Sequence, residues 1–189
     1  MKKTLILSLA LASFSSTAFA DPPQPKIVVL DRAAIMQFSK AGQDIAKQMQ
    51  TYSAQAKADL QGQGRALEAE ERSLQQQVAI LAPDVKAKKI AAFQAKQQAL
   101  QGEVAKKDEQ MRYAFALARQ QMEAKLGPIL QQLVKARGAN MVLDKQAVVF
   151  ATAGGFDITG DAINQLNQQL PTLKVNFNVT PPPAPTPKK

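Results

Sequence analysis

The sequence predicts an α+β protein, mainly α-helical, in which a long antiparallel helical hairpin projects from a small strand-bearing body shared between subunits. Three observations predict this class. Residues 45–136 are rich in Gln, Ala and Lys and place apolar residues at helical spacing. Proline interrupts that stretch near residues 82–84. Short β-branched runs lie on both sides of the stretch, in a remainder too small to form a stable core by itself.

The stretch from residue 45 to residue 136 is predicted to be a helical hairpin arm. A proline in a helix interior removes a backbone donor and clashes with the preceding turn, so two helices joined by a reversal near 82–84 are favoured over one rod. The first apolar stripe comprises Ile45, Met49, Tyr52, Ala56, Leu60, Leu67, Leu74, Val78 and Leu81. The second comprises Leu100, Val104, Met111, Phe115, Ala118, Met122, Leu126, Ile129 and Leu133. Each stripe is one helix wide, so the arm buries it only against itself and should project.

Glycine and proline mark the expected irregularities of the arm. Gly42 is expected to act as a hinge where the arm begins, and Gly62 and Gly64 are expected to soften the first helix. Pro128 should start a separate terminal segment at a kink, because proline is tolerated in a first helical turn. Gly138 should end the helix as a left-handed cap.

Residues 26–44 and 137–173 are predicted to form a discontinuous oligomerisation body. We expect a buried strand at 26–31, a short helical turn at 33–38, and a hairpin of strands at 140–144 and 147–151. A short helix at 160–170 follows, with Thr159 as its N-cap. The apolar residues expected to join subunits are Ile27, Val28, Val29, Leu30, Met141, Val142, Leu143, Val148, Val149 and Phe150. Open strand edges in so small a body favour closure of the sheet between chains.

The two ends of the chain are predicted to lie outside the fold. Residues 1–20 have a basic start, a short apolar segment and a small-residue cleavage site, which indicate a signal peptide cleaved after Ala20 and export from the cytoplasm. Loss of Lys2 and Lys3 lowers the net charge from +9 to +7. Residues 21–25 read as a proline-rich leader, and residues 174–189 as a proline-rich disordered tail.

Composition argues against most catalytic chemistry. The chain has no Cys and no His, which removes thiolate nucleophiles, thiolate metal sites and the commonest general base. Carboxylates such as Glu68 and Asp108 stand four residues before an arginine, as on an exposed helix face. We therefore expect no enzyme activity, no cofactor and no metal. Export and an aromatic content of 5% argue against a nucleic-acid partner, despite the basic pI.

The candidate binding residues lie on the arm. Residues 40–137 hold 16 Lys and Arg against 10 Asp and Glu, a surplus that would attract acidic unfolded chains and lipid phosphates. Lys86, Lys88 and Lys89 form a basic cluster beside the turn, although a solvated helix face explains each lysine equally simply. The apolar candidates are Phe93, Met111, Phe115 and Met122. Packing between the two helices is the default assignment for these four.

Taken in order, these features resemble the Skp/OmpH family of bacterial periplasmic chaperones. The resemblance covers the mature chain to about Leu173. It is carried by the run at 26–31 with Ala34-Ile35-Met36, by the Gln-rich hairpin, by the run at 138–144, and by Asp157-Ile158-Thr159 before the short helix.

The resemblance implies a homotrimer with a barrel-like β hub and three arms around a cavity. Family members hold unfolded outer-membrane proteins there without ATP or other cofactor, in the Gram-negative periplasm, on the way to the outer-membrane assembly machinery. Some contact lipopolysaccharide through basic residues, for which this chain has no specific motif. The alternative from the sequence is a structural coiled-coil protein of the envelope whose arms bind a folded partner or the cell wall.

Overall fold

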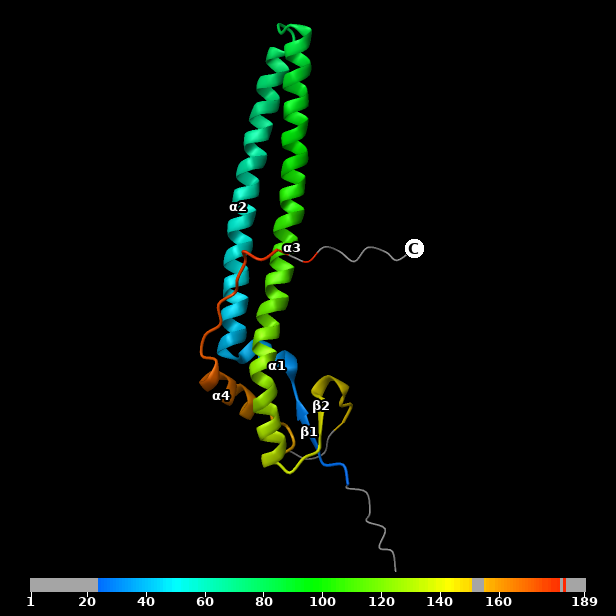
Figure 1. The fold of residues 1–189 in the computed structure, drawn as a ribbon, viewed down its shortest axis with the longest axis vertical. Helices are drawn as coiled ribbons and strands as arrows, with labels where there is room; N and C mark the ends of the chain where they lie inside the picture. Colours follow the sequence, from blue (N-terminus) through cyan, green and yellow to red (C-terminus); the bar gives the residue numbers. More distant parts are fainter. Residues whose placement is uncertain (1–23, 151–154, 181, 183–189) are drawn as a thin grey trace, which may run out of the picture.

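The computed structural model describes residues 24–150, 155–180 and 182 of the chain. A paired-helix arm rises from a base that holds the strands and the short helices (Figure 1). In chain order the elements are β1 (Ile27–Leu30), α1 (Arg32–Phe38), α2 (Lys40–Gln77), α3 (Pro83–Ala136), β2 (Met141–Asp144), the 3-10 turn η1 (Lys145–Ala147) and α4 (Thr159–Gln169). The predicted signal peptide at 1–20 lies outside the described residues.

The predicted helical hairpin is confirmed. Helix α2 ends at Gln77 and α3 begins at Pro83, where proline at the first helical position loses no hydrogen bond. Pro128 corrects one expectation, because α3 continues through it to Ala136. Ile129 and Leu133 are buried just beyond Pro128, and their packing outweighs the lost backbone donor. Gly138 has a φ of 58°, as expected of a left-handed cap.

The expected hinge at Gly42 is also wrong. Helix α2 begins at Lys40, and the break from α1 falls at Ser39, whose buried hydroxyl accepts a hydrogen bond from the Gly42 N–H at 3.0 Å. A Cβ atom at Gly42 would lie 1.9 Å from the carbonyl oxygen of Met36. Glycine is required here for close packing of α1 on α2, and the backbone is held in place.

The two strands form a parallel pair, in the register Ile27 to Met141 and Leu30 to Asp144. The predicted antiparallel hairpin of 140–144 with 147–151 is therefore wrong. The carboxylate of Asp144 accepts a hydrogen bond from the Gln146 N–H at 3.1 Å and turns the chain into η1. Residues 148–150 belong to no strand, and residue 151 lies outside the described residues.

The other side of β1 contacts the segment before α4. The Val29 N–H donates to the carbonyl of Phe156 at 2.7 Å, and the Ile158 N–H donates to the carbonyl of Val29 at 2.9 Å. Thr159 does not cap α4 as predicted. Its hydroxyl accepts a hydrogen bond from the Asp31 N–H at 2.9 Å, while the Asp157 carboxylate accepts one from the Thr159 N–H. These bonds fasten the start of α4 to the end of β1.

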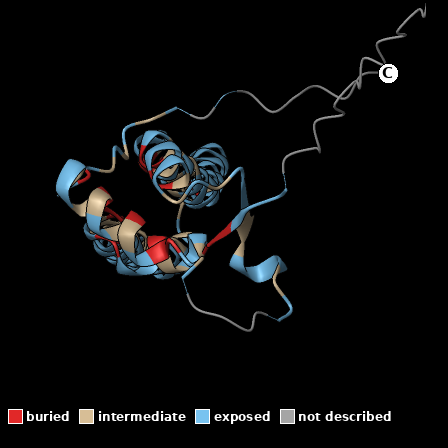
Figure 2. Cartoon of the chain, turned by 90° about the horizontal axis from the view of Figure 1, so that it is seen from below, coloured by how far each residue is buried: buried red, intermediate tan, exposed pale blue. Residues whose placement is uncertain are grey.

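The hydrophobic core lies in the base, where β1, α1, α4 and the last third of α3 meet (Figure 2). Its buried members are Val28, Leu30, Ile35, Ala41, Ile45, Ala118, Met122, Leu126, Ile129, Leu133, Ile158, Ala162, Leu166 and Leu173. The arm beyond this core is two helices thick. The base therefore has several layers to exclude water, whereas the arm has one.

The segment after α4 runs along α2 (Figure 1). Residues 174–179 were expected in the disordered tail, but the Phe177 ring stacks on the Tyr52 ring with centroids 4.1 Å apart. The Val175 N–H donates to the side-chain oxygen of Gln48 at 3.0 Å. The sequence alternates apolar and polar residues here, so one face of an extended chain can bury against the arm.

Candidate functional site

One edge of the small sheet is the first candidate site. β1 lies between β2 on one side and residues 156–158 on the other, so its backbone is paired on both sides. Within the described residues β2 has β1 as its single strand neighbour. An unpaired edge presents free N–H and C=O groups to another strand.

Exposed apolar side chains lie on the two strands and in the loop after η1. Met141 and Val142 of β2 are 44% and 38% exposed, and Ile27 of β1 is 39% exposed. Val149 and Phe150, in the loop after η1, are almost wholly exposed. A cavity of about 390 Å³ lies beside them, lined in part by Val148 and Phe156. We call Ile27, Met141, Val142, Val149 and Phe150 the edge patch. Large exposed apolar side chains in this number are typical of a protein interaction surface.

The predicted assembly residues thus divide into three groups by burial. Val28, Val29 and Leu30 are buried within this subunit and hold its own base together. Leu143 and Val148 are half-buried, and the edge patch holds the rest. The exposed ring of Phe38 at the end of α1, 56% accessible, was not predicted. Its position in an amphipathic turn was the available signal.

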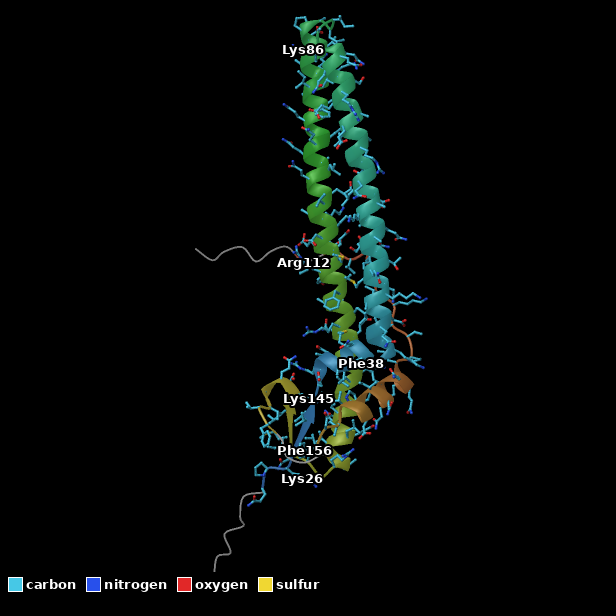
Figure 3. All side chains as sticks on the ribbon, turned by 180° about the vertical axis from the view of Figure 1, so that it is seen from behind. Lys26, Phe38, Lys86, Arg112, Lys145 and Phe156 are labelled. Carbon is cyan, nitrogen blue, oxygen red and sulfur yellow. The ribbon has the colours of Figure 1, made fainter. Side chains whose placement is uncertain are left out.

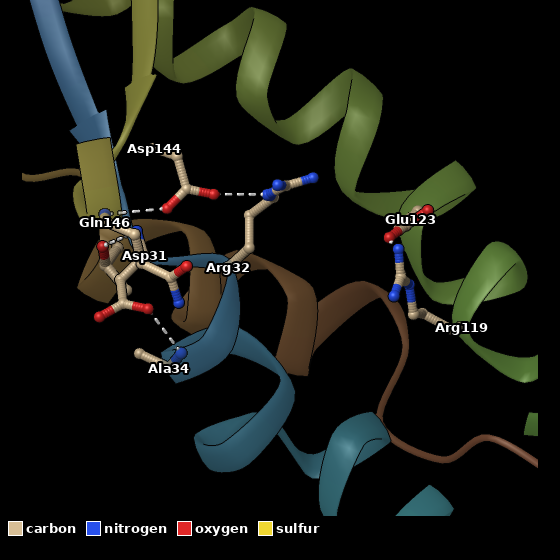
Figure 4. A network of polar contacts seen from close by, with 8 residues as sticks. Asp31, Arg32, Ala34, Arg119, Glu123, Asp144 and Gln146 are labelled. Carbon is tan, nitrogen blue, oxygen red and sulfur yellow. Dashed lines mark hydrogen bonds and ion pairs between the residues drawn. The ribbon is translucent and has the colours of Figure 1, made fainter. Parts of the chain in front are cut away.

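A polar network fixes the chain after β2 against the base (Figure 4). The Arg32 side chain of α1 donates to the Asp144 carboxylate at 2.7 Å. This bond, together with the hydrogen bond from the Gln146 N–H, lowers the pKa of Asp144 from its usual value, and the same contact raises the pKa of Arg32. The loop that carries Val149 and Phe150 therefore starts from a restrained position.

A second ion pair restrains the first residue of η1. Lys145 contacts the Asp157 carboxylate at 3.0 Å. Partial burial acts to raise the pKa of Asp157, but hydrogen bonds from Thr159 and Lys145 outweigh it, and the pKa is lowered. The pKa of Lys145 is raised by its hydrogen bond to Asp157. The two ion pairs, at Asp144 and at Lys145, thus tie the start of η1 to the base.

The basic cluster lies at the tip of the arm, where Figure 3 labels Lys86. Lys88 and Lys89 are exposed and Lys86 is half-buried. The Lys89 ammonium donates to the side-chain oxygen of Gln77 at 2.6 Å, which joins the two helices next to the turn. In the described part of the chain none of the three lysines forms an ion pair. Their charge remains available to an acidic partner.

The four apolar candidates on the arm separate by burial. Phe93 is 8% exposed between the helices, and Met122 is 3% exposed in the core, so both serve packing. Met111 is half-buried and Phe115 is 38% exposed. Met111 lines a groove of about 440 Å³ together with Tyr52, Ala56, Leu60 and Val104, which was not predicted as a unit.

In the described residues, no group of three or more acidic side chains is placed to hold a metal ion. Their helices include none that is both long and apolar enough to span a bilayer. The carboxylates of the arm lie in exposed pairs such as Glu70 with Lys96, at 2.8 Å, and Asp108 with Arg112, at 3.0 Å.

Comparison with known proteins identifies the family. A family model for OmpH-like outer membrane proteins matches residues 26–166. No curated protein matches the chain. A crystal structure from Caulobacter crescentus CB15, of a protein assigned as an outer membrane chaperone (OmpH-like), superposes with a TM-score of 0.74 at 24% identity, covering 82% of this chain and 91% of that one. At this identity the similarity establishes the fold. Because the family model spans the strands, the hairpin and most of α4, the chain belongs to the OmpH-like family.

Proposed function

We propose that this protein is an ATP-independent holdase chaperone of the periplasm, which holds unfolded outer-membrane proteins between the arms of a homotrimer. The observation that carries the proposal is the division of the molecule. A well-packed base presents an open strand edge, and a two-helix arm extends far beyond the core with a groove and a basic tip. The 38 residues of α2 span about 57 Å at 1.5 Å per residue.

Self-association through the base is supported by the edge patch. A single subunit leaves β2 unpaired on one side within the described residues, and exposes apolar side chains on the strands and in the loop after η1. Strand addition from a second subunit would satisfy the backbone groups and cover the patch together. Three such contacts related by rotation would close the assembly and leave three arms on one side of it.

Capture of unfolded chains is supported by the chemistry of the arm. The groove beside Met111 is shallow and mostly apolar, so it suits many weak contacts rather than one specific ligand. The surplus of basic residues on the arm would speed encounter with acidic unfolded proteins, and added salt would screen that attraction. Gly62 and Gly64 do not form a nucleotide-binding loop, because such a loop follows a strand and both glycines lie inside α2.

The proposed location rests on residues 1–20, which have the sequence pattern of a secretory signal. The proposed partners are other copies of this chain and unfolded outer-membrane proteins. Lipopolysaccharide and the outer-membrane assembly machinery are further candidates that the basic arm would suit. No cofactor, metal or nucleic acid is included.

The direct test is an aggregation assay. A denatured β-barrel protein is diluted from urea, and light scattering is followed with and without this protein. We expect scattering to fall to baseline at a small molar excess of trimer. Unchanged scattering at that excess would remove the holdase proposal and favour a structural coiled-coil protein of the envelope.

A shortened arm separates assembly from capture. Deletion of residues 60–107, closed by a short glycine turn, should leave a trimer by mass measurement in solution that no longer suppresses aggregation. The matched control is a charge substitution in the edge patch, Val142→Glu, which should keep the arm but abolish the trimer. A monomeric shortened protein would show that the arm, and not the base, joins the subunits.

A further inference from the structure

The segment that follows α4 has the pattern of an isolated β-strand. Residues 173–180 read Leu-Lys-Val-Asn-Phe-Asn-Val-Thr, a strict alternation of apolar and polar side chains. Leu173 is buried and Val175, Phe177 and Val179 are half-buried, while the polar residues between them are exposed. We call residues 173–179 the strap. Within the described residues no strand pairs with it, and it lies instead against the helices of the arm.

Two side chains of α2 bind the backbone of the strap. The Asp44 carboxylate accepts a hydrogen bond from the Leu173 N–H at 3.1 Å. One turn further along α2, the Gln48 amide donates to the Leu173 carbonyl at 2.7 Å and accepts from the Val175 N–H at 3.0 Å. The NH2 group and the oxygen of the Gln48 side chain both bond the backbone of the strap, as the N–H and C=O groups of a neighbouring strand would. Contacts to the backbone do not depend on the sequence of the bound segment.

An aromatic contact holds the next apolar residue. The rings of Phe177 and Tyr52 are parallel to within 2° at a centroid distance of 4.1 Å. The Lys107 ammonium lies 5.8 Å from the centre of the Tyr52 ring, and the Tyr52 hydroxyl donates to the Gln110 side chain at 3.5 Å. Tyr52 therefore offers an oriented aromatic face to whatever segment lies beside it.

The surface that the strap uses continues along the arm. The groove of about 440 Å³ starts at Tyr52 and is lined further along by Ala56, Leu60 and Val104. The side chain of Phe177 ends at Tyr52 and is not part of that lining. A chain that bound at Tyr52 and entered this groove would bury additional apolar side chains there, whereas the strap itself leads to Asn178 beside Gly102 and Lys106 of α3.

We infer that α2 carries a binding site for extended chains with alternating apolar residues, built from Asp44, Gln48 and Tyr52, and that the strap is its resident occupant. Transmembrane β-strands of outer-membrane proteins have this alternation and are rich in aromatic residues at their ends. The inference rests on the proposed function and names the feature of the cargo that this site recognises. An unfolded chain that binds this site displaces the strap. The strap competes for the site at high local concentration, because it is covalently tethered to it.

A peptide with the sequence of residues 171–180 tests the site itself. Labelled with a dye and followed by anisotropy, it should bind Phe177→Ala about three- to tenfold more tightly than the unaltered protein, because loss of the ring stack weakens the competing strap. Lys174→Gln, on the exposed face of the strap, is the matched control and should bind like the unaltered protein. Equal affinity in Phe177→Ala and Lys174→Gln would overturn the inference.

The site residues are tested in the Phe177→Ala background. Adding Gln48→Ala should weaken peptide binding roughly tenfold, because two backbone hydrogen bonds are lost. Adding Gln50→Ala, an exposed glutamine on the same helix, should leave binding unchanged. Equal effects of the two changes would overturn the assignment of Gln48.

A tryptophan at the end of the strap reports displacement by cargo. The chain has no Trp, so the full-length Phe177→Trp protein has a single reporter, stacked on Tyr52. Its emission should move to longer wavelength when excess peptide is added, or an unfolded β-barrel protein whose own tryptophans are replaced by phenylalanine. Unchanged emission while light scattering shows that cargo is held would overturn the inference and leave the holdase proposal standing. Loss of aggregation suppression, with the peptide still shifting the emission, would remove the holdase proposal instead.

Discussion

The base and the outer arm of this molecule are built from the same helices but to different thicknesses. In the base, α2 and α3 are covered by α1, α4 and the strap, and side chains such as Ile129 and Leu166 are fully buried. In the outer arm, residues 56–110, the same two helices have only each other. Phe93, at 8% exposure, is the one residue of that range that is buried.

The difference teaches where stability resides. A helix pair that buries one stripe leaves most of its surface in water, so its backbone can open locally without loss of the base. A layered base excludes water from several sides and resists opening. The outer arm can therefore change its spacing around cargo of varied shape while the base keeps the subunit folded. The following substitutions are ordered from the largest expected effect to the smallest.

Ile129→Ala should give the largest loss of stability. Ile129 is completely buried in the core, and its truncation leaves a cavity that costs about 3 kcal/mol in the free energy of unfolding. Leu67→Ala, at a half-buried position of the outer arm, is the matched control and should cost about 1 kcal/mol. Urea denaturation at one fixed protein concentration measures both. Equal losses would break the comparison between base and arm.

Gly42→Ala should also destabilise the base. The added Cβ atom would lie 1.9 Å from the Met36 carbonyl oxygen, so α1 and α2 must move apart at a cost of roughly 2 kcal/mol. Thermal unfolding followed by circular dichroism measures this loss. An unchanged melting temperature would show that α1 and α2 can move apart at little cost, as a hinge at Gly42 requires.

Gly62→Ala sharpens the comparison because the same substitution should act with the opposite sign. No atom lies within 4 Å of a Cβ built at Gly62, and alanine is favoured over glycine in a helix interior by about 1 kcal/mol. We expect slower hydrogen exchange in the outer arm and weaker suppression of aggregation, because a stiffer arm adapts less well. Exchange that is unchanged near residue 62 would contradict the view that glycine softens the arm.

Asp157→Asn should give the smallest effect, and one that depends on pH. The pKa of Asp157 in the folded protein lies below its ordinary value of 3.8, so its contribution to stability is present above that pH and is lost as the pH falls through the folded value. At pH 7 the substitution should cost about 0.5 kcal/mol, since the pair with Lys145 is exposed.

The urea midpoints of Asp157→Asn and the unaltered protein, compared between pH 7 and pH 2.5, test this dependence. The difference between them should shrink as the pH falls below 3.8. A difference that does not change with pH would assign the effect to packing and not to charge.

Local pattern was enough to predict the arm. The helical spacing of apolar residues and the break at Pro83 are properties of neighbouring residues, and the structure has two helices with that break between them. The left-handed Gly138 followed from the same kind of reasoning. The client-binding residues stay a prediction, and helical spacing alone does not distinguish buried Phe93 from exposed Phe115.

The base depended on contacts between distant residues, which local pattern does not specify. The β-branched run at 147–150 has the composition of a strand, yet the Asp144 carboxylate turns the chain into η1 before it. The parallel partner of β2 is β1, more than a hundred residues away in the sequence. The strap alternates like a strand, but only the positions of Gln48 and Tyr52 on the folded arm show where it binds.

Hydrogen exchange along the assembled protein, followed by mass spectrometry, tests most directly the division between a stable base and an adaptable arm. We predict slow exchange across residues 118–133 and in α4, and exchange faster by orders of magnitude across residues 60–107. Added unfolded β-barrel protein should slow exchange across residues 60–107 and leave residues 118–133 and α4 unchanged. Uniform protection along the whole of α2 and α3, before and after addition, would contradict the division.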